Sequence, residues 1–168
     1  MSEEEKDAGV KLIRTPVQLD YNYSAGRSAT RFLRAIKDGK LIGQRCPVDG
    51  RVYFPSRGSC PMHGVPIDGE PVELEDKGTL VTFSIVRIPA EAVPLDVPFV
   101  TVQVLLDGAD TILMHLLGNC KVEDVHMGMR VKAVWKPKEE WEESVANILY
   151  FEPLDEPDAA YESYKEHI

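Results

Sequence analysis

The sequence predicts a mainly β protein in which an N-terminal helix and a zinc-ribbon-like module precede a five-stranded OB-type barrel. Two observations carry this prediction. A C-P-x-x-G turn occurs twice within residues 46–64, and five stretches rich in Val, Ile, Thr and aromatic residues follow from residue 79. With 168 residues, 43% hydrophobic and 28% charged, the chain has the composition of a globular protein and can bury a core.

Pattern and composition divide the chain into four parts. Residues 1–23 show no periodicity and are expected to form a flexible arm that a partner could order. Residues 24–70 should hold the helix and the ribbon-like module, and residues 71–153 the barrel. Residues 154–168 form an acidic tail, whose sequence EPDAAYESYKEHI fits either a terminal helix or an acidic docking strip.

A short amphipathic helix is predicted over residues 28–38. Ser28 can cap its start, and Gly39 suits the left-handed position after its end. The helix should pack its apolar stripe on this chain or on a partner. Four apolar residues fall on one face at helical spacing, namely Ala29, Phe32, Leu33 and Ile36, and three arginines lie on another, namely Arg27, Arg31 and Arg34.

The barrel prediction rests on the order of five strand-like stretches. The second and third are joined by DGAD at residues 107–110, a hairpin signal, and a longer link separates the third from the fourth. This arrangement is typical of an OB barrel, and a five-stranded sandwich is the alternative. The proline-rich loop at residues 89–98 should lie at the barrel mouth, where a ligand would bind. The stretches are TLVTFSIVRI, FVTVQVLL, TILMHLL, MRVKAVW and SVANILYF.

The strongest chemical signal is a set of four residues: Cys46, Asp49, Cys60 and His63. Each pair is separated by two positions, and ten positions lie between the pairs, which is the layout of a zinc ribbon. Two tight turns can point four side chains at one cation, and zinc accepts thiolate, imidazole and carboxylate. The alternative is a ribbon held without metal by turn hydrogen bonds, because Asp followed by Gly is also an ordinary turn sequence.

Charge is unevenly distributed along the chain. The net charge is −9, but residues 26–60 carry eight Arg or Lys against two Asp, so this basic segment is +6 and the remainder is −15. A basic segment on an acidic protein indicates an anionic ligand or an acidic partner, although a solvated helix face has the same pattern. The overall acidity argues against a protein that follows a nucleic-acid backbone.

Cysteine content and the N-terminus indicate a cytoplasmic protein. Three cysteines, Cys46, Cys60 and Cys120, do not suggest a disulfide framework. The N-terminal sequence MSEEEKDAGV has no apolar stretch behind a basic start, and no run in the chain is long enough to span a bilayer. The expected compartment is the cytoplasm, with no membrane association.

The sequence resembles the DUF35 family, whose members join a rubredoxin-like zinc ribbon to an OB fold. The resemblance covers about residues 26–153. The family's ribbon usually has four cysteines, whereas this chain has Asp49 and His63 at the second and fourth positions. The matching stretches are LIGQRCPVDGRVYFPSRGSCPMHG, GTLVTFSIV, LLDGADTILMHL and GMRVKAVW.

The resemblance implies a function and a partner. Family members are accessory subunits of thiolase-fold enzymes in acyl-CoA condensation, thiolysis or retro-aldol cleavage, including steroid side-chain degradation. The partner would then hold the catalytic Cys and His residues. This chain would support the active-site entrance and could hold part of the CoA moiety. The CoA phosphates suit bidentate arginines, and Arg31, Arg34 and Arg57 are the first candidates for contact with these phosphates or with the partner. The helix at residues 28–38 is also expected to contact the partner.

Two other functions remain open. OB folds often bind single-stranded nucleic acid, which would require a basic and aromatic strand face. An iron site for electron transfer would favour four thiolates, and the ribbon offers two. The sequence contains no phosphate loop, dinucleotide fingerprint or nucleophile elbow, so an enzyme acting alone is not expected.

Overall fold

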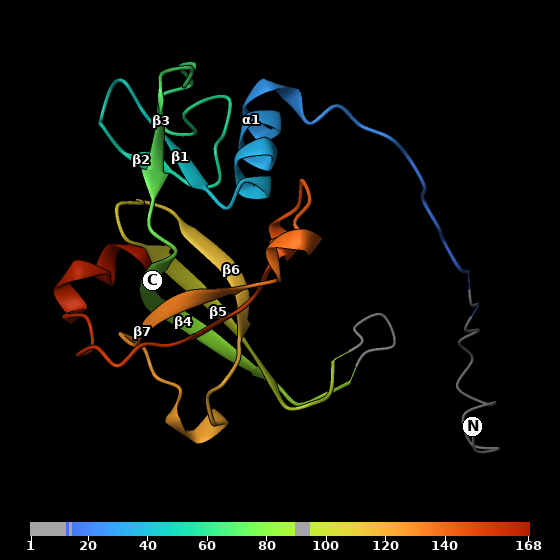
Figure 1. Cartoon of the computed structure of the whole chain (residues 1–168), viewed down its shortest axis with the longest axis vertical. Coiled ribbons are helices and arrows are strands. Elements are labelled where there is room, and N and C mark those ends of the chain that lie inside the picture. The colour runs from blue at the N-terminus through green and yellow to red at the C-terminus, as the bar shows by residue number, and fades with distance from the viewer. Residues whose placement is uncertain (1–12, 14, 90–94) are drawn as a thin grey trace.

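The computed structural model describes residues 13, 15–89 and 95–168, and it contains two sheets and one α-helix (Figure 1). The smaller sheet and the helix stand at one end of the barrel. No helix in the described ranges has the length and apolarity needed to cross a membrane. The elements are α1 (Gly26–Lys37), β1 (Leu41–Arg45), β2 (Val52–Tyr53), β3 (Pro71–Leu74), β4 (Lys77–Val86), β5 (Phe99–Leu106), β6 (Ile112–Leu117), β7 (Arg130–Trp135) and β8 (Ile148–Pro153), with short 3-10 turns at Val122–Asp124, Lys138–Glu140, Val145–Asn147, Tyr161–Ser163 and Lys165–His167.

The helix begins earlier than the sequence predicted. Ala25 is the N-cap residue and no side chain caps the helix, so the prediction that Ser28 caps it is wrong: Ser28 lies inside the first turn. The end was predicted correctly, because Gly39 has a φ of +74° and its N–H donates to the Ile36 carbonyl at 3.1 Å. The apolar face of α1 packs on its own chain, with Phe32 and Ile36 buried.

The small sheet has the order β2-β1-β3, and both pairings are antiparallel. β1 and β2 lie on either side of the first C-P-x-x-G turn. The third strand was not predicted, because PVEL begins with proline and only its last residue is buried. Residues 71–74 pair with β1 rather than with a barrel strand.

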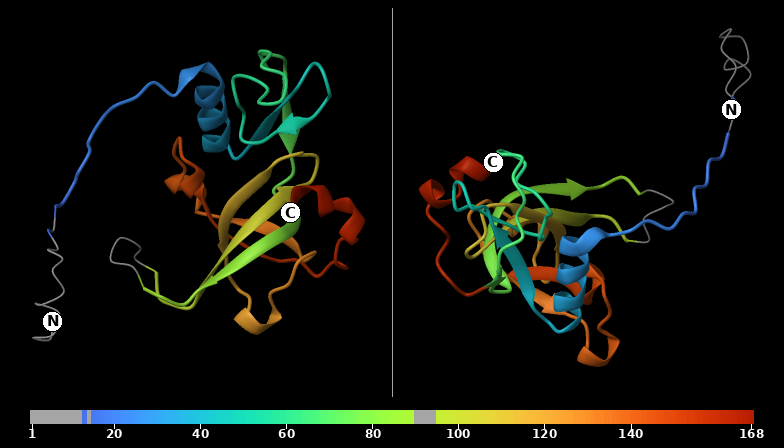
Figure 2. Two further views of the ribbon diagram at one scale, coloured as in Figure 1. Left: turned by 180° about the vertical axis from the view of Figure 1, so that it is seen from behind. Right: turned by 90° about the horizontal axis from the view of Figure 1, so that it is seen from above.

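The five remaining strands form a closed barrel with the order β4-β5-β6-β8-β7, which confirms the OB-type prediction and excludes the sandwich (Figure 2). All pairings are antiparallel except that of β6 with β8, which is parallel and consists of one register pair, Leu117 with Phe151. The barrel therefore closes along a short seam between β6 and β8. Beside this pair, the Gly118 N–H donates to the Phe151 carbonyl at 2.8 Å.

One apolar core joins the two sheets and the helix. Inward residues of β5 alternate with outward ones, and Val102 and Val104 are buried against Leu80, Val131 and Phe151. The same cluster continues through Phe54 of the small module to Phe32 and Ile36 of α1. The helix and the barrel therefore share an apolar contact.

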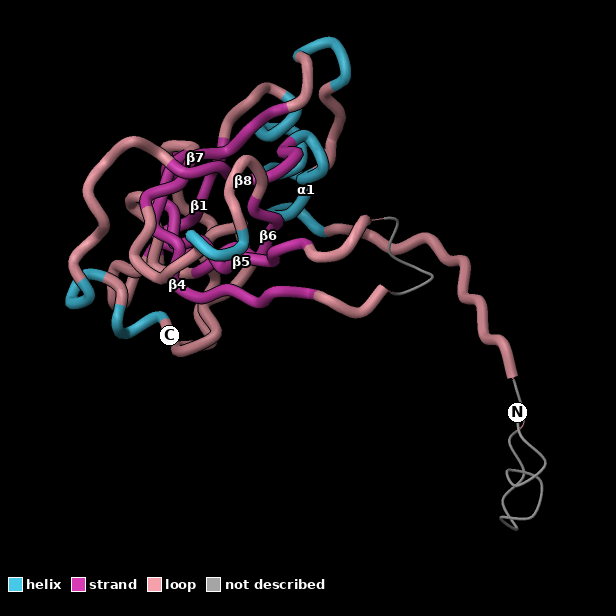
Figure 3. The backbone as a smooth tube through the Cα atoms, turned by 90° about the horizontal axis from the view of Figure 1, so that it is seen from below, coloured by secondary structure: helices cyan, strands magenta, loops and turns pink. Residues whose placement is uncertain are grey.

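Two predicted segments have different local structure. The expected strand at residues 144–151 begins at Ile148, because Ser144 accepts the Ala146 N–H at 3.1 Å and starts a 3-10 turn. The tail forms two 3-10 turns rather than an α-helix and runs beside the barrel (Figure 3), with Tyr164 buried. Residues 90–94 of the proline-rich loop lie outside the described residues, so its expected position at the barrel mouth stays a prediction.

Candidate functional site

The two C-P-x-x-G turns fold alike. In each, the cysteine N–H donates to the carbonyl of the residue five places later, and the glycine N–H donates back to the cysteine carbonyl, at 2.8 to 3.0 Å. The glycines, Gly50 and Gly64, have φ values of +76° and +65°, which side-chain-bearing residues rarely adopt. The repeated sequence therefore builds two matched loops, and each aims a cysteine and one further side chain at the same point.

The four predicted ligands come together. One ligand atom from each of Cys46, Asp49, Cys60 and His63 lies within 4.8 Å of all the others. The His63 Nδ1 atom is 3.7 Å from Cys46 Sγ, 3.3 Å from Cys60 Sγ and 3.7 Å from Asp49 Oδ2. Bonds of about 2.0–2.3 Å to a tetrahedral zinc place its ligand atoms roughly 3.3–3.8 Å apart. The cluster could therefore hold a metal ion, and its donor set is compatible with zinc.

The two cysteines form the inner side of the cluster and the other two ligands form its outer side. Both cysteines are 1% exposed, in a small apolar cluster with Tyr53 and Ile67. The side chains of Asp49 and His63 are 25% and 34% exposed. This small cluster is separate from the main core, so few apolar contacts hold the two turns together.

The surroundings change the acidity of three ligands. Burial alone would raise the pKa of Cys60, but hydrogen bonds with the Tyr53 hydroxyl and His63 lower it to about 6. Burial raises the pKa of Cys46. Partial burial opposes ionisation of Asp49, but the Arg51 backbone N–H, a hydrogen bond with Cys46 and the charges of His63 and Arg51 together outweigh it, and the pKa is lowered. A thiolate and a carboxylate are thus available at neutral pH, and a cation would complete ionisation of the second thiol.

Tyr53 is a member of the site that the sequence analysis did not single out as a ligand neighbour. Its hydroxyl lies 3.4 Å from Cys60 Sγ, and this hydrogen bond, followed by burial, raises the pKa of Tyr53 to about 12. The hydroxyl therefore stays protonated and donates to the thiolate. Tyr53 lies in β2, and the antiparallel pairing of β2 with β1 brings its side chain close to the two turns.

The basic residues gather at the start of α1. Arg31 and Arg34 line a hollow together with Arg27, and Arg57 lines a neighbouring hollow that Arg27 also borders. Arg31 donates to the Gly69 carbonyl at 3.3 Å, and the Arg57 guanidinium lies 5.9 Å from the centre of the Tyr53 ring. The ribbon loop thus brings Arg57 near the helix arginines, and Arg27 is an additional candidate.

Comparison with known proteins identifies the family. A "DUF35 domain-containing scaffold protein" from Methanocaldococcus jannaschii is 35% identical over 117 residues, which cover 68% of this chain and 82% of that protein. The chain belongs to the DUF35 family. A scaffold protein of the same description from Pyrococcus furiosus is 30% identical over 118 residues, covering 68% of this chain and 84% of that protein. Residues 71–136 also match the model of the ChsH2 C-terminal OB-fold domain.

Two solved structures share the fold of this DUF35 protein. One is described as the Ltp2-ChsH2(DUF35) aldolase, with a TM-score of 0.58 and 24% identity, and the match covers 79% of this chain and 98% of that chain. The other is a DUF35 protein of unknown function from Sulfolobus solfataricus, with a TM-score of 0.56 and 19% identity over 74% of this chain and 83% of that chain. Each match therefore covers more of the chain than the barrel alone.

Proposed function

We propose that this DUF35 protein is a non-catalytic accessory subunit of a thiolase-fold enzyme that acts on acyl-CoA substrates, as a thiolase or a retro-aldolase. Family membership carries the proposal: the related archaeal proteins are described as scaffold proteins, and one structure of the same fold is described as an aldolase with a DUF35 subunit. Degradation of a steroid side chain is one reaction of this class.

The chemistry of the chain supports an accessory role. The sequence offers no nucleophile elbow, phosphate loop or dinucleotide fingerprint. The metal cluster has four protein ligands, which is typical of structural zinc, whereas catalytic zinc keeps one position for water or substrate. Cys46, Asp49, Cys60 and His63 would hold zinc, which would supply a fixed cross-link between the two turns.

The basic hollows support binding of CoA phosphates. Arg27, Arg31 and Arg34 converge from successive turns of α1, and Arg57 approaches from the ribbon. Guanidinium groups bind phosphate oxygens in bidentate pairs, and the rest of the chain is acidic. A CoA molecule held here would place its phosphates on this subunit and its acyl end toward the partner.

The test is co-expression of this chain with the thiolase-fold enzymes of the same genome, followed by size-exclusion chromatography, metal analysis and an acyl-CoA turnover assay. We expect one enzyme to elute with this chain and to lose activity without it. The Arg31→Gln, Arg34→Gln and Arg57→Gln variants should raise the KM for acyl-CoA without separating the subunits. The proposal would be refuted if every thiolase-fold enzyme of the genome were fully active alone and none eluted with this chain.

Binding of single-stranded nucleic acid has less support. The two strands β5 and β6, FVTVQVLL and ILMHLL, contain no Arg or Lys. Affinity for a phosphate backbone depends on such charges and falls steeply with salt. A titration with labelled oligonucleotide at low salt should show no saturable binding.

A further inference from the structure

The segment before α1 has the side-chain pattern of a β-strand without a neighbouring strand. In residues 15–24, which we call the arm, apolar side chains alternate strictly with polar ones at residues 17–24. The backbone is extended and belongs to no helix or sheet. Residues 17–24 therefore alternate, contrary to the expectation that residues 1–23 show no periodicity. Figure 1 shows the arm leading away from the rest of the protein.

The side chains of the arm already stand on two faces. The Tyr21 and Tyr23 rings lie 6.4 Å apart on one face, and the Gln18 amide donates to the Asp20 carboxylate at 2.8 Å on the other. On the apolar face, Val17, Leu19, Tyr21 and Tyr23 are 76–79% exposed. Large apolar side chains in such a row are unusual on a free surface and mark an interaction site.

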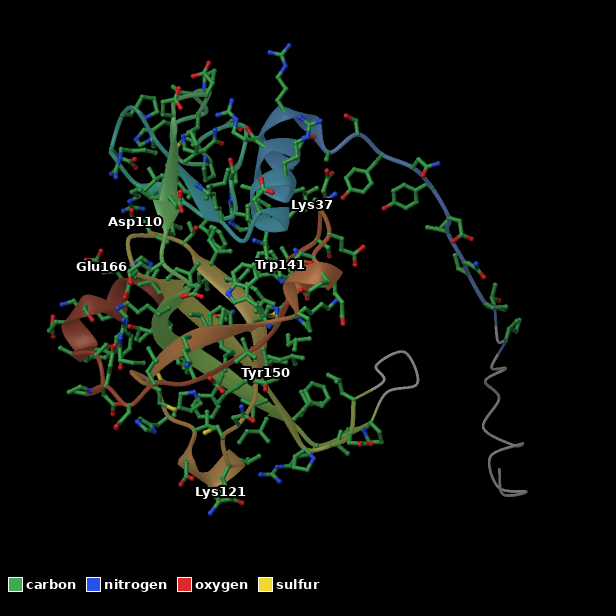
Figure 4. The ribbon with its side chains drawn as sticks, in the orientation of Figure 1. Lys37, Asp110, Lys121, Trp141, Tyr150 and Glu166 are labelled. Atoms are coloured by element: carbon green, nitrogen blue, oxygen red, sulfur yellow. The ribbon has the colours of Figure 1, made fainter. Side chains whose placement is uncertain are left out.

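The helix is not available for the partner contact that its pattern suggested. Phe32 and Ile36, at the centre of its apolar face, are buried against Phe54 and the main core. After the end of α1, the Trp141 ring packs against Gly39, and Figure 4 shows Trp141 near Lys37. At this end of the described chain, the large apolar side chains that remain exposed are therefore in the arm, not in the helix.

The described part of the chain does not offer the arm a sheet edge of matching length. The barrel closes, and the edges that it leaves open are shorter than the arm: residues 81–86 of β4 and residues 112–116 of β6 pair with β5 alone. In the small sheet, one edge strand, β2, has two residues, and the other, β3, has four and begins with Pro71. A second copy would offer only the same edges. An extended segment of ten residues is about 33 Å long, so a ladder for it must come from a different protein.

We propose that residues 15–24 add as an edge strand to a sheet of the enzyme subunit that this chain accompanies. The backbone would complete the partner's ladder, and Val17, Leu19, Tyr21 and Tyr23 would fill an apolar recess beside that edge. This inference rests on the proposed function. The four side chains can bury on the order of 500 Å², less than the roughly 800 Å² per partner of a standard interface, so the arm extends a larger contact.

The experiment compares two double variants of the full chain in the co-expressed complex. Leu19→Asp with Tyr21→Asp places two carboxylates on the apolar face, and Gln18→Asp with Asn22→Asp places two on the polar face. The charge change is the same, and neither pair touches the folded core. We expect the first pair to weaken partner binding at least about tenfold and the second less than about threefold. Hydrogen exchange of the wild-type complex should show protection at alternate amides of the arm.

The outcomes separate the two proposals. If the wild-type chain binds no thiolase-fold enzyme, the proposed function fails and the inference fails with it. If the wild-type chain binds and the apolar-face variant binds equally well, or the arm amides stay unprotected, the inference fails while the function stands. If the isolated chain forms a dimer that the apolar-face variant dissociates, the arm pairs with a second copy and the inference is overturned.

Discussion

The ribbon module and the barrel reach a stable structure by different means. The barrel closes five strands around a continuous apolar core, whereas the two turns of the module enclose a separate cluster of Cys46, Tyr53, Cys60 and Ile67. So small a cluster provides little hydrophobic stabilisation, and four ligand atoms stand where a cation would link the turns. We therefore expect the module to depend on a metal ion held by this cluster and the barrel on its core.

Removing a metal ion bound at this cluster should have the largest effect, and the effect should be confined to the module. With a chelator, or in Cys60→Ser, we expect amide exchange in residues 46–67 to accelerate roughly 10,000-fold or more while the barrel strands keep their protection. Hydrogen-exchange mass spectrometry measures both regions in one sample. Cys120→Ser is the matched control, because Cys120 lies outside the cluster and should leave exchange unchanged. Equal protection with and without chelator would show that the turns hold without metal.

Truncating a core residue should destabilise the barrel instead of the ribbon module. Phe151 is 0% exposed and lies 5.7 Å from the His115 ring, edge to face. Phe151→Ala should lower the free energy of unfolding by about 3–5 kcal/mol, which urea unfolding measures. Leu149→Ala, at a solvent-facing position of the same strand, should cost under about 1 kcal/mol. A similar loss for both variants would contradict the central position of Phe151 in the core.

Removing one buried hydrogen-bond donor between the helix and the barrel should have a smaller effect on stability than truncating Phe151. Asn147 is completely buried, and its amide donates to the Ile36 carbonyl at 3.2 Å and to the Glu142 carbonyl at 2.7 Å. Asn147→Ala leaves both carbonyls without this donor and should cost about 1–3 kcal/mol. Helix and barrel signals should then unfold at different urea concentrations. Glu143→Ala, at an exposed neighbour, should leave a single transition, and coincident transitions in both variants would argue against this link.

The smallest effect concerns the tail and depends on pH. The Asp124 carbonyl and then Asp158 raise the pKa of His126, whose Nε2 lies 2.8 Å from the Asp158 carboxylate. The stabilisation is fully present below the unfolded pKa of about 6.5 and is lost as the pH rises through the higher folded value. Because His126 is exposed, it should be under about 0.5 kcal/mol. Protection factors of the tail amides from pH 5 to 8, which remove the intrinsic rise of exchange with pH, measure it, and His126→Gln should abolish their pH dependence.

The barrel was predictable because its strands follow local rules. FVTVQVLL alternates buried and less buried residues along its whole length, and β5 has the predicted bounds, Phe99–Leu106. The same rules failed where tertiary contacts decide the conformation. Residues 145–147 look like the start of a strand, but the buried Asn147 needs the Ile36 carbonyl, which lies 111 residues earlier in the chain. No local pattern contains that contact.

The candidate metal ligands were predictable from spacing, whereas their environment was not. The repeated turn sequence identifies Cys46, Asp49, Cys60 and His63 as one cluster, and the structure brings all four together. The hydroxyl of Tyr53 reaches Cys60 only because β2 pairs with β1. Likewise, the position of Arg57 beside Arg27 depends on how the ribbon loop lies against α1. Such neighbours come from folding, so the sequence alone could not reveal them.

The short seam between β6 and β8 gives the barrel a preferred place to open. Each other junction is held by several register pairs, but here one pair, Leu117 with Phe151, closes the circle. Thermal fluctuations should separate these two strands before any others and admit water to the Phe151 ring. The barrel would then open into a curled five-stranded sheet, and its earliest unfolding intermediate would keep the other four strand pairings.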